Sequence, residues 1–131
     1  MRELKQIKTL INQMEGKDYD LILTFARGGL IPSQFIAYAK DIQVIHTYSQ
    51  ARAIGSSRVI QPTQKILVVD DICDSGATLT KAISLLRELK YGGIIDTAVM
   101  FKRYNSSFSP TYYGELIESD DYHLFTWDEE L

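Results

Sequence analysis

The most informative stretch of this chain is KILVVDDICDSGATLT, at residues 65–80. Four apolar residues lead into two acids, Asp70 and Asp71, and a short polar loop follows before a helical pattern begins. This order predicts a buried strand, a tight loop and the start of a helix. The backbone N–H groups of such a loop and the positive end of the helix dipole favour an anion, typically a phosphate.

The side chains of this loop add to that prediction. Gly76 permits a close approach of the backbone to a ligand, and Ser75 and Thr78 add hydroxyl donors. The two acids just upstream suit sugar hydroxyl groups or a hard cation such as Mg²⁺. A phosphate, a diol and a metal ion at one loop together describe a ribose phosphate.

The same stretch closely resembles the 5-phosphoribosyl-1-diphosphate (PRPP) binding motif of type I phosphoribosyltransferases. Cys73 departs from that motif, in which an aliphatic residue is more usual, and we interpret it as a small buried hydrophobic residue. The fragment ILVVDD also resembles the start of a response-regulator receiver domain. That domain opens with its motif, and the part of this chain that follows residue 65 is too short for it.

A second strand–loop–helix pattern comes earlier in the chain. Residues 19–25 (YDLILTF) predict a strand, and a loop with Arg27, Gly28 and Gly29 leads into a helix. A guanidinium group and N–H groups at a helix start suit a diphosphate. The run ARGGLIPS resembles the pyrophosphate loop of 6-oxopurine phosphoribosyltransferases, especially the xanthine–guanine branch, and the resemblance implies a cis peptide bond after Ala26. Two anion loops at the carboxyl ends of parallel strands match PRPP, which carries a phosphate and a diphosphate.

The composition is that of an ordinary globular protein. The chain has 131 residues, 45% of them apolar, and a net charge of −3, so we expect one domain and no binding to nucleic acid. A single cysteine cannot form an internal disulfide and fits a reducing compartment. No signal peptide and no membrane span of about 20 apolar residues is evident, so we expect a cytoplasmic protein without a membrane partner.

The remaining segments follow an alternating α/β order. An amphipathic helix near the N-terminus ends at Gly16, and residues 42–48 predict a strand in which His46 is a half-buried strand residue. Residues 49–63 are polar and form either a plain surface loop or, as the family resemblance implies, a loop that closes over the substrates. Residues 94–101 predict the last strand of the parallel set.

The C-terminal part is expected to bind the base. Lys102 and Arg103 stand at the carboxyl end of that last strand, and the resemblance assigns Lys102 to the 6-oxo group of a purine. Residues 104–131 look like the small hood of the family, on a core of about residues 1–103. The resemblance implies that Tyr122 stacks on the base, that carbonyl groups near His123 contact it, and that Asp128 lies near the metal ion.

The resemblance therefore implies a type I phosphoribosyltransferase fold, with an open parallel sheet flanked by helices and a C-terminal hood. It implies a Mg²⁺-dependent transfer of 5-phosphoribosyl from PRPP to a 6-oxopurine in purine salvage, with release of diphosphate, by a homodimer or homotetramer. Asp74 is the implied general base, and Asp71 and Asp128 are the implied metal ligands. The PRPP contacts are expected at Arg27, Gly28, Gly29, Asp70, Asp71, Asp74, Ser75, Gly76, Ala77 and Thr78.

Two other functions remain open from the sequence. One is a regulator on the same fold that senses PRPP without catalysis, which would have no need of a purine-contacting Lys102. The other is a phosphoribosyltransferase for another acceptor, such as a pyrimidine, which the placement of Lys102 and Tyr122 does not favour.

Overall fold

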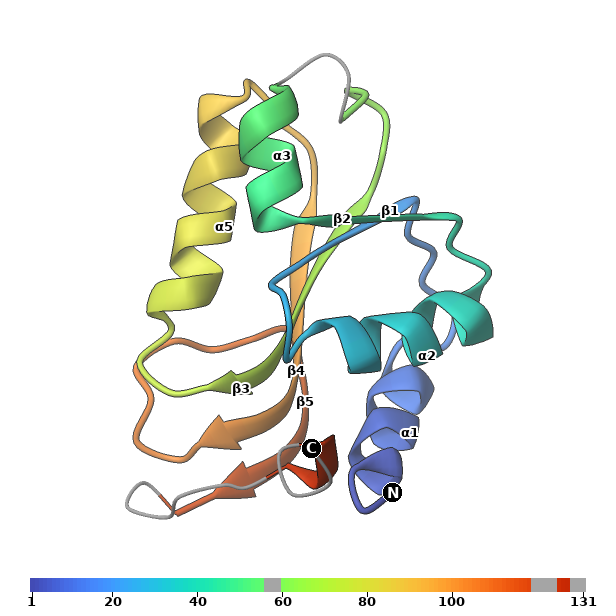
Figure 1. Ribbon diagram of the computed structural model, residues 1–131, viewed down its shortest axis with the longest axis vertical. Coiled ribbons are helices and arrows are strands. Elements are labelled where there is room, and N and C mark those ends of the chain that lie inside the picture. The colour runs from blue at the N-terminus through green and yellow to red at the C-terminus, as the bar shows by residue number, and fades with distance from the viewer. Residues whose placement is uncertain (56–59, 119–124, 128–131) are drawn as a thin grey trace.

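The computed structural model describes residues 1–55, 60–118 and 125–127, and its centre is a parallel β-sheet between two layers of helices (Figure 1). The strand order is β2-β1-β3-β4-β5, and each adjacent pair runs parallel. The strands are β1 (Leu21–Thr24), β2 (Val44–Thr47), β3 (Ile66–Cys73), β4 (Ile95–Arg103) and β5 (Tyr112–Ile117). The helices are α1 (Leu4–Gln13), α2 (Leu30–Lys40), α3 (Tyr48–Ile54) and α5 (Ala77–Glu88). The predicted fold class is confirmed.

The strands are apolar on both faces because each face is covered by helices. Alternate strand residues point to opposite sides. One cluster joins the sheet to α1 and α2, and it includes Ile7, Leu10, Ile22, Ile36, Leu67 and Val69. The other joins the sheet to α3 and α5, and it includes Leu23, Ala51, Val68, Leu79, Ala82 and Leu86. Because helices cover both faces of the sheet, a polar ligand can reach it only at the ends of the strands. In open α/β sheets, ligands bind at the carboxyl ends.

Helix α1 has the apolar face that its spacing predicts. Ile7, Leu10 and Met14 are fully buried, and Gly16 takes a positive φ of 78° just after the helix. The polar side of α1 reaches β5: Nε2 of Gln13 donates to the carbonyl oxygen of Tyr113 at 2.9 Å.

Strand β5 was not predicted. The apolar pattern predicts the last parallel strand at residues 94–101, whereas β4 continues to Arg103 and β5 pairs with it from Ala98↔Tyr112 to Arg103↔Ile117. Part of the segment assigned to a hood is therefore an edge strand of the sheet. A glycine makes the packing possible, because a Cβ on Gly114 would lie 2.6 Å from the carbonyl oxygen of Met100 and 2.8 Å from Cβ of Gln6.

Helix α3 corrects the first part of the loop expected at residues 49–63, whether a plain surface loop or one that closes over substrates, because Tyr48–Ile54 is helical. Thr47 and Gln50 form a capping box, in which each side chain bonds the backbone N–H of the other residue. Ala51 is fully buried against the sheet. The structure describes this segment except for residues 56–59. His46 lies on β2 and is half-buried, as predicted.

The two ends of the described chain meet beside α1. Glu3 is 1% exposed, and its carboxylate accepts from the backbone N–H and the hydroxyl of Thr126 at 2.8 and 2.6 Å. Phe125 stacks on Trp127 with ring centroids 4.9 Å apart. Among the helices of the described ranges, none has the length and apolar character needed to cross a membrane.

Candidate active site

The two predicted anion loops lie side by side at the carboxyl edge of the sheet. One loop joins β1 to α2 and the other joins β3 to α5, and β1 and β3 are adjacent with Thr24 level with Val69. The peptide bond between Ala26 and Arg27 is cis, so that prediction is confirmed. Arg27 is exposed to solvent. The sequence-based placement of both loops at one edge therefore agrees with the structure.

Gly28 is the point at which the first loop meets the end of β3. A Cβ built on Gly28 would lie 2.1 Å from Oδ2 of Asp71, so the loop or that carboxylate would have to shift. Gly29 is equally confined, because its Cβ would lie 2.2 Å from Oγ1 of Thr24. That hydroxyl donates to the carbonyl oxygen of Val69 at 2.7 Å. The absence of a side chain at both positions thus lets the first loop rest closely against β3.

Asp70 and Asp71 form a crowded pair of acids at the end of β3. Asp70 is 8% exposed, and burial together with the charge of Asp71 raises the pKa of Asp70 to about 8. Each carboxylate accepts from the next backbone N–H, from Asp71 to Asp70 at 2.9 Å and from Ile72 to Asp71 at 2.8 Å. A bound cation relieves repulsion between such neighbours, so the donor set fits Mg²⁺.

This pair is too small to enclose a metal ion by itself. Within the described ranges, no group of three or more His, Cys, Asp or Glu side chains is arranged to hold one. Mg²⁺ is commonly bound by one or two carboxylates together with substrate phosphates and water. The geometry therefore suits a metal ion that arrives with an anionic substrate.

The second loop, residues 74–78, lines a hollow of about 200 Å³ that extends over residues 70–79. Gly76 takes a φ of 88°, and a Cβ there would lie 2.2 Å from Cβ of Phe108. The backbone N–H of Ala77 donates to Oγ of Ser75 at 3.2 Å. In the part of the chain that the structure describes, the amides of Ser75 and Gly76 show no acceptor. They are available to an anion in the hollow.

Asp74 has a partner that the sequence analysis did not identify. Its Oδ1 lies 3.2 Å from Nε of Arg103, the last residue of β4. The strand register explains the pair. Cys73, the last residue of β3, is level with Lys102, so Asp74 just after β3 comes level with Arg103. Lys102 is half-buried at the same edge. The ends of β3 and β4 thus bring Asp74 next to Arg103 and place Lys102 at the same edge of the sheet.

Three predicted residues fall outside the described part of the chain. Tyr122 and His123 were expected at the base and Asp128 near the metal ion, and all three lie in ranges that the structure does not describe. Their roles stay predictions.

Comparison with known proteins agrees with the fold. Residues 2–131 match the phosphoribosyl transferase domain family. Over 127 residues the chain is 28% identical to the xanthine-guanine phosphoribosyltransferase of Nitratidesulfovibrio vulgaris, which covers 90% of this chain and 74% of that protein.

Other relatives are named for a different class of base, a pyrimidine. The chain is 26% identical over 100 residues to the orotate phosphoribosyltransferase of Staphylothermus marinus. The match covers 74% of this chain but only about half of that relative, 48% of its length. Among solved structures, a purine phosphoribosyltransferase from Pyrococcus horikoshii Ot3 superposes with a TM-score of 0.79 at 24% identity, covering 97% of this chain and 89% of that one. At that identity the superposition shows the fold alone.

Proposed function

The chain belongs to the phosphoribosyl transferase domain family, and from that membership we propose that it transfers the 5-phosphoribosyl group of PRPP to a 6-oxopurine base. The products are a purine nucleoside monophosphate and diphosphate, as in purine salvage. The close approach of Gly28 to Asp71 carries the proposal, because it sets the first anion loop against the end of the strand that leads into the second loop. A ligand with a phosphate at one end and a diphosphate at the other matches that arrangement.

Each end of PRPP has its own loop in this proposal. Arg27 and the amides of Gly28 and Gly29 bind the diphosphate, and a guanidinium suits that group because it offers paired donors. Residues 74–78 bind the 5′-phosphate at the start of α5, where the helix dipole adds a favourable field. Asp70 and Asp71 accept from the 2′- and 3′-hydroxyl groups of the ribose.

Mg²⁺ is the cofactor that this site would hold. Asp71, with Asp70 beside it, is its ligand within the described residues, and the family resemblance adds Asp128. When bound, Mg²⁺ neutralises charge on the leaving diphosphate. Burial and the neighbouring charge of Asp71 raise the pKa of Asp70 to about 8. A cation would stabilise both ionised carboxylates, which supports this assignment.

The chemical step breaks the bond between C1′ and the diphosphate oxygen and forms a bond from C1′ to N9 of the purine. The diphosphate leaves with the electron pair of the broken bond, and C1′ gains cationic character as it departs. Asp74 accepts the proton that the purine loses and opposes the charge on the sugar. Arg103 holds the Asp74 carboxylate at 3.2 Å, and Lys102 donates to the 6-oxo group of the base.

A pyrimidine acceptor is the second candidate. The relative from Staphylothermus marinus is an orotate phosphoribosyltransferase by name, so orotate belongs in any test. A PRPP-sensing regulator is a third class, and it would bind PRPP without consuming a base.

The test is to incubate the protein with Mg²⁺, PRPP and each base of a panel, and to measure the release of diphosphate. Guanine, xanthine, hypoxanthine, adenine, orotate and uracil cover the acceptor classes. We expect diphosphate release with at least one 6-oxopurine. Release with orotate alone would favour the pyrimidine function, and PRPP binding without release for any base would favour the regulator.

A further inference from the structure

The connection from β4 to β5, residues 104–111, is a crossover without a helix. β4 and β5 run parallel, so the chain must turn back along the sheet between them. Such a crossover usually takes about a dozen residues or more and contains a helix. The end of this one is fixed to β4, because the N–H of Thr97 donates to Oγ1 of Thr111 at 3.0 Å and the N–H of Thr111 donates to Oγ1 of Thr97 at 2.9 Å.

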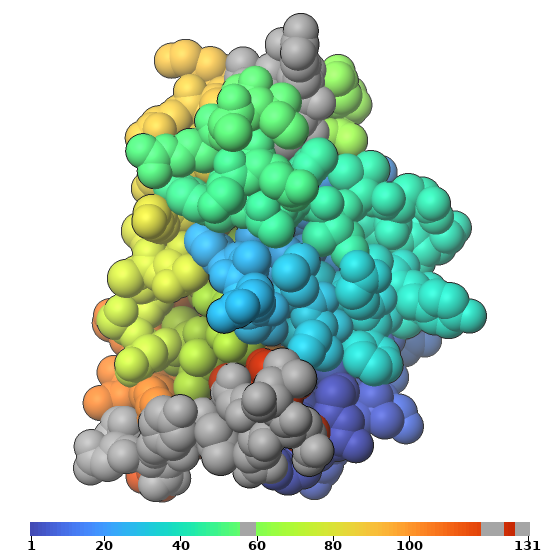
Figure 2. All heavy atoms as spheres, in the orientation of Figure 1, coloured from blue at the N-terminus to red at the C-terminus, as the bar shows by residue number. Residues whose placement is uncertain are grey.

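This crossover lies against the loop for which we propose 5′-phosphate binding. In Figure 2 its orange atoms border the yellow-green atoms at the start of α5. A Cβ built on Gly76 would lie 2.2 Å from Cβ and 2.7 Å from Cγ of Phe108, so the side chain of Phe108 occupies the space beside this glycine. Phe108 is half-buried and also packs against the core cluster that contains Leu79 and Leu86. The ring therefore ties the backbone of the loop to the core.

Three contacts join residues 73–76 to residues 103–108. They are the approach of Cys73 to Ser106 with Sγ 3.5 Å from Oγ, the ion pair of Asp74 with Arg103 at 3.2 Å, and the packing of Gly76 on Phe108. Ser106 also fixes the ring from its own side, because its Oγ accepts from the backbone N–H of Phe108 at 3.3 Å. The loop before α5 is thus held by the crossover at successive points along its length.

Phe108 acts on this loop from outside the hollow. Residues 70–79 line the hollow of about 200 Å³, and Phe108 is not among the lining residues. A phosphate in the hollow would therefore meet the amides of the loop without touching the ring. That arrangement gives Phe108 a role in positioning rather than in direct contact with the substrate.

We propose that the crossover holds the loop at residues 74–78 in its binding conformation before PRPP arrives, with Phe108 as the positioning residue for the 5′-phosphate. This role rests on the proposed function, in which the hollow receives that phosphate. A backbone that is already fixed need not be ordered when the ligand binds, so the affinity is higher. Arg103 contacts a carboxylate and Phe108 contacts backbone, so we expect Arg103 to affect the chemical step and Phe108 to affect binding.

Calorimetry with two ligands tests the role of Phe108 on the full chain. In the proposed function PRPP with Mg²⁺ uses both anion loops, whereas diphosphate with Mg²⁺ uses the first loop alone. We expect Phe108→Ala to weaken PRPP binding at least about tenfold and to leave diphosphate binding within about twofold of the wild type. Phe108→Leu keeps a γ-carbon beside Gly76 and should recover most of the affinity for PRPP.

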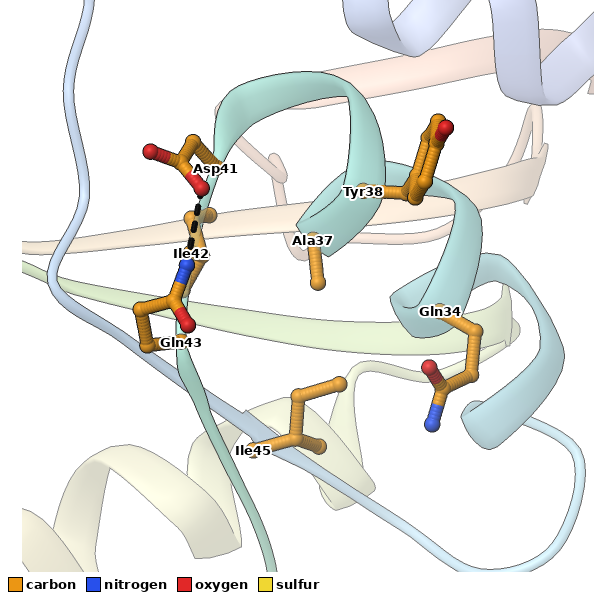
Figure 3. A pocket seen from close by; sticks show the side chains of 7 residues that line it. All are labelled: Gln34, Ala37, Tyr38, Asp41, Ile42, Gln43 and Ile45. Carbon is orange, nitrogen blue, oxygen red and sulfur yellow. Dashed lines mark hydrogen bonds between the residues drawn. The ribbon is translucent and has the colours of Figure 1, made fainter.

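Tyr38→Ala is the matched control, because it also removes an aromatic ring. Tyr38 is 93% exposed on α2 and borders a separate hollow, which Figure 3 shows with Gln34, Ala37 and Ile45 around it. Both affinities should equal those of the wild type in this variant. Circular dichroism should show that the variants are folded.

Ser106→Ala provides the same comparison with the ring left in place. It removes the acceptor of the Phe108 N–H, so PRPP binding should weaken by about threefold while diphosphate binding stays unchanged. Wild-type affinity for PRPP in Phe108→Ala would overturn the proposal. So would an equal loss of affinity for both ligands, since general destabilisation has that effect. A wild-type chain that does not bind PRPP would instead refute the proposed function, and the role of Phe108 with it.

Discussion

Nε of Arg103 lies 3.2 Å from Oδ1 of Asp74, and Nη1 of the same side chain donates to the carbonyl oxygen of Glu118 at 3.3 Å. The guanidinium side chain is 14% exposed and the Asp74 side chain is 74% exposed. One cation thus joins the loop after β3 to the end of β5. It holds a solvent-facing carboxylate in a defined place at the edge where both anion loops lie.

Arg103→Gln is expected to slow catalysis more than it weakens PRPP binding. Arg103 lies 3.2 Å from the carboxylate that we propose as the base, so its loss should affect the chemical step first. We expect kcat to fall between about tenfold and a hundredfold, the range that small misplacement of a reacting group produces. Steady-state kinetics would measure this, and Arg103→Lys should recover part of the loss because it keeps the charge. A loss confined to the KM for PRPP would instead place Arg103 among the binding residues.

Asp74→Asn should separate chemistry from binding still more clearly. The substitution keeps the shape of the side chain and removes its charge and basicity. Loss of a general base lowers the rate by about 10²–10⁴-fold. The affinity for PRPP, measured by calorimetry, should change little because the loop amides remain. Near-normal turnover with poor PRPP binding would require another base.

Gly28→Ala should disrupt the packing of the first loop against the end of β3. The added methyl group would lie 2.1 Å from Oδ2 of Asp71, so either the loop or the carboxylate must move. We expect PRPP to bind at least about tenfold more weakly, a loss of about 1.4 kcal/mol.

Gly92→Ala is the matched control for that substitution. A Cβ on Gly92 has nothing within 4 Å, so the free energy of unfolding should change by less than about 0.5 kcal/mol. The affinity of both variants for PRPP is then measured by titration. Equal affinities in the two variants would show that the Gly28–Asp71 contact is not part of the PRPP site.

The ligand-free protein should lose stability as the pH rises. The pKa of Asp70 is about 8 in the folded state, against about 3.9 for an unperturbed Asp. Between those values the folded state keeps a proton that the unfolded state has released, so the free energy of unfolding falls with increasing pH. We expect a loss of at least about 1.4 kcal/mol, equivalent to one pKa unit, between about pH 5 and pH 9. Urea denaturation at several pH values measures it.

Asp70→Asn is the control for this pH dependence. An amide oxygen can still accept from the N–H of Asp71, which lies 2.9 Å from Oδ1 of Asp70. The variant should show a flatter profile and greater stability at high pH, while Mg²⁺-dependent PRPP binding weakens. An unchanged slope would mean that other groups cause the pH dependence.

The parts of the fold that were predicted are those with local signals. Both strand–loop–helix units combine an apolar run with a glycine loop and a helical pattern, and the cis bond at Ala26 accompanies the first of them. Helix α3 was missed because its signal is a capping box of Thr47 and Gln50 inside a polar segment. With only Ala51 buried, it lacks the apolar stripe that reveals a helix.

The missed strand and the missed ion pair both depend on contacts distant in sequence. Strand β5 contains Gly114 and Glu115, which are poor strand residues in isolation. Gly114 is tolerated because α1 packs closely there. The contact of Arg103 with Asp74 follows from the register of β3 with β4, which no local pattern specifies.

A competition assay tests the central proposal most directly. The protein is incubated with Mg²⁺, PRPP and an equimolar mixture of guanine, xanthine, hypoxanthine, adenine and orotate, and the nucleotides formed are identified by mass spectrometry. We expect a 6-oxopurine monophosphate as the main product, and we expect that product to be lost in Asp74→Asn. Orotidine monophosphate as the main product, or no nucleotide from a protein that binds PRPP, would contradict it.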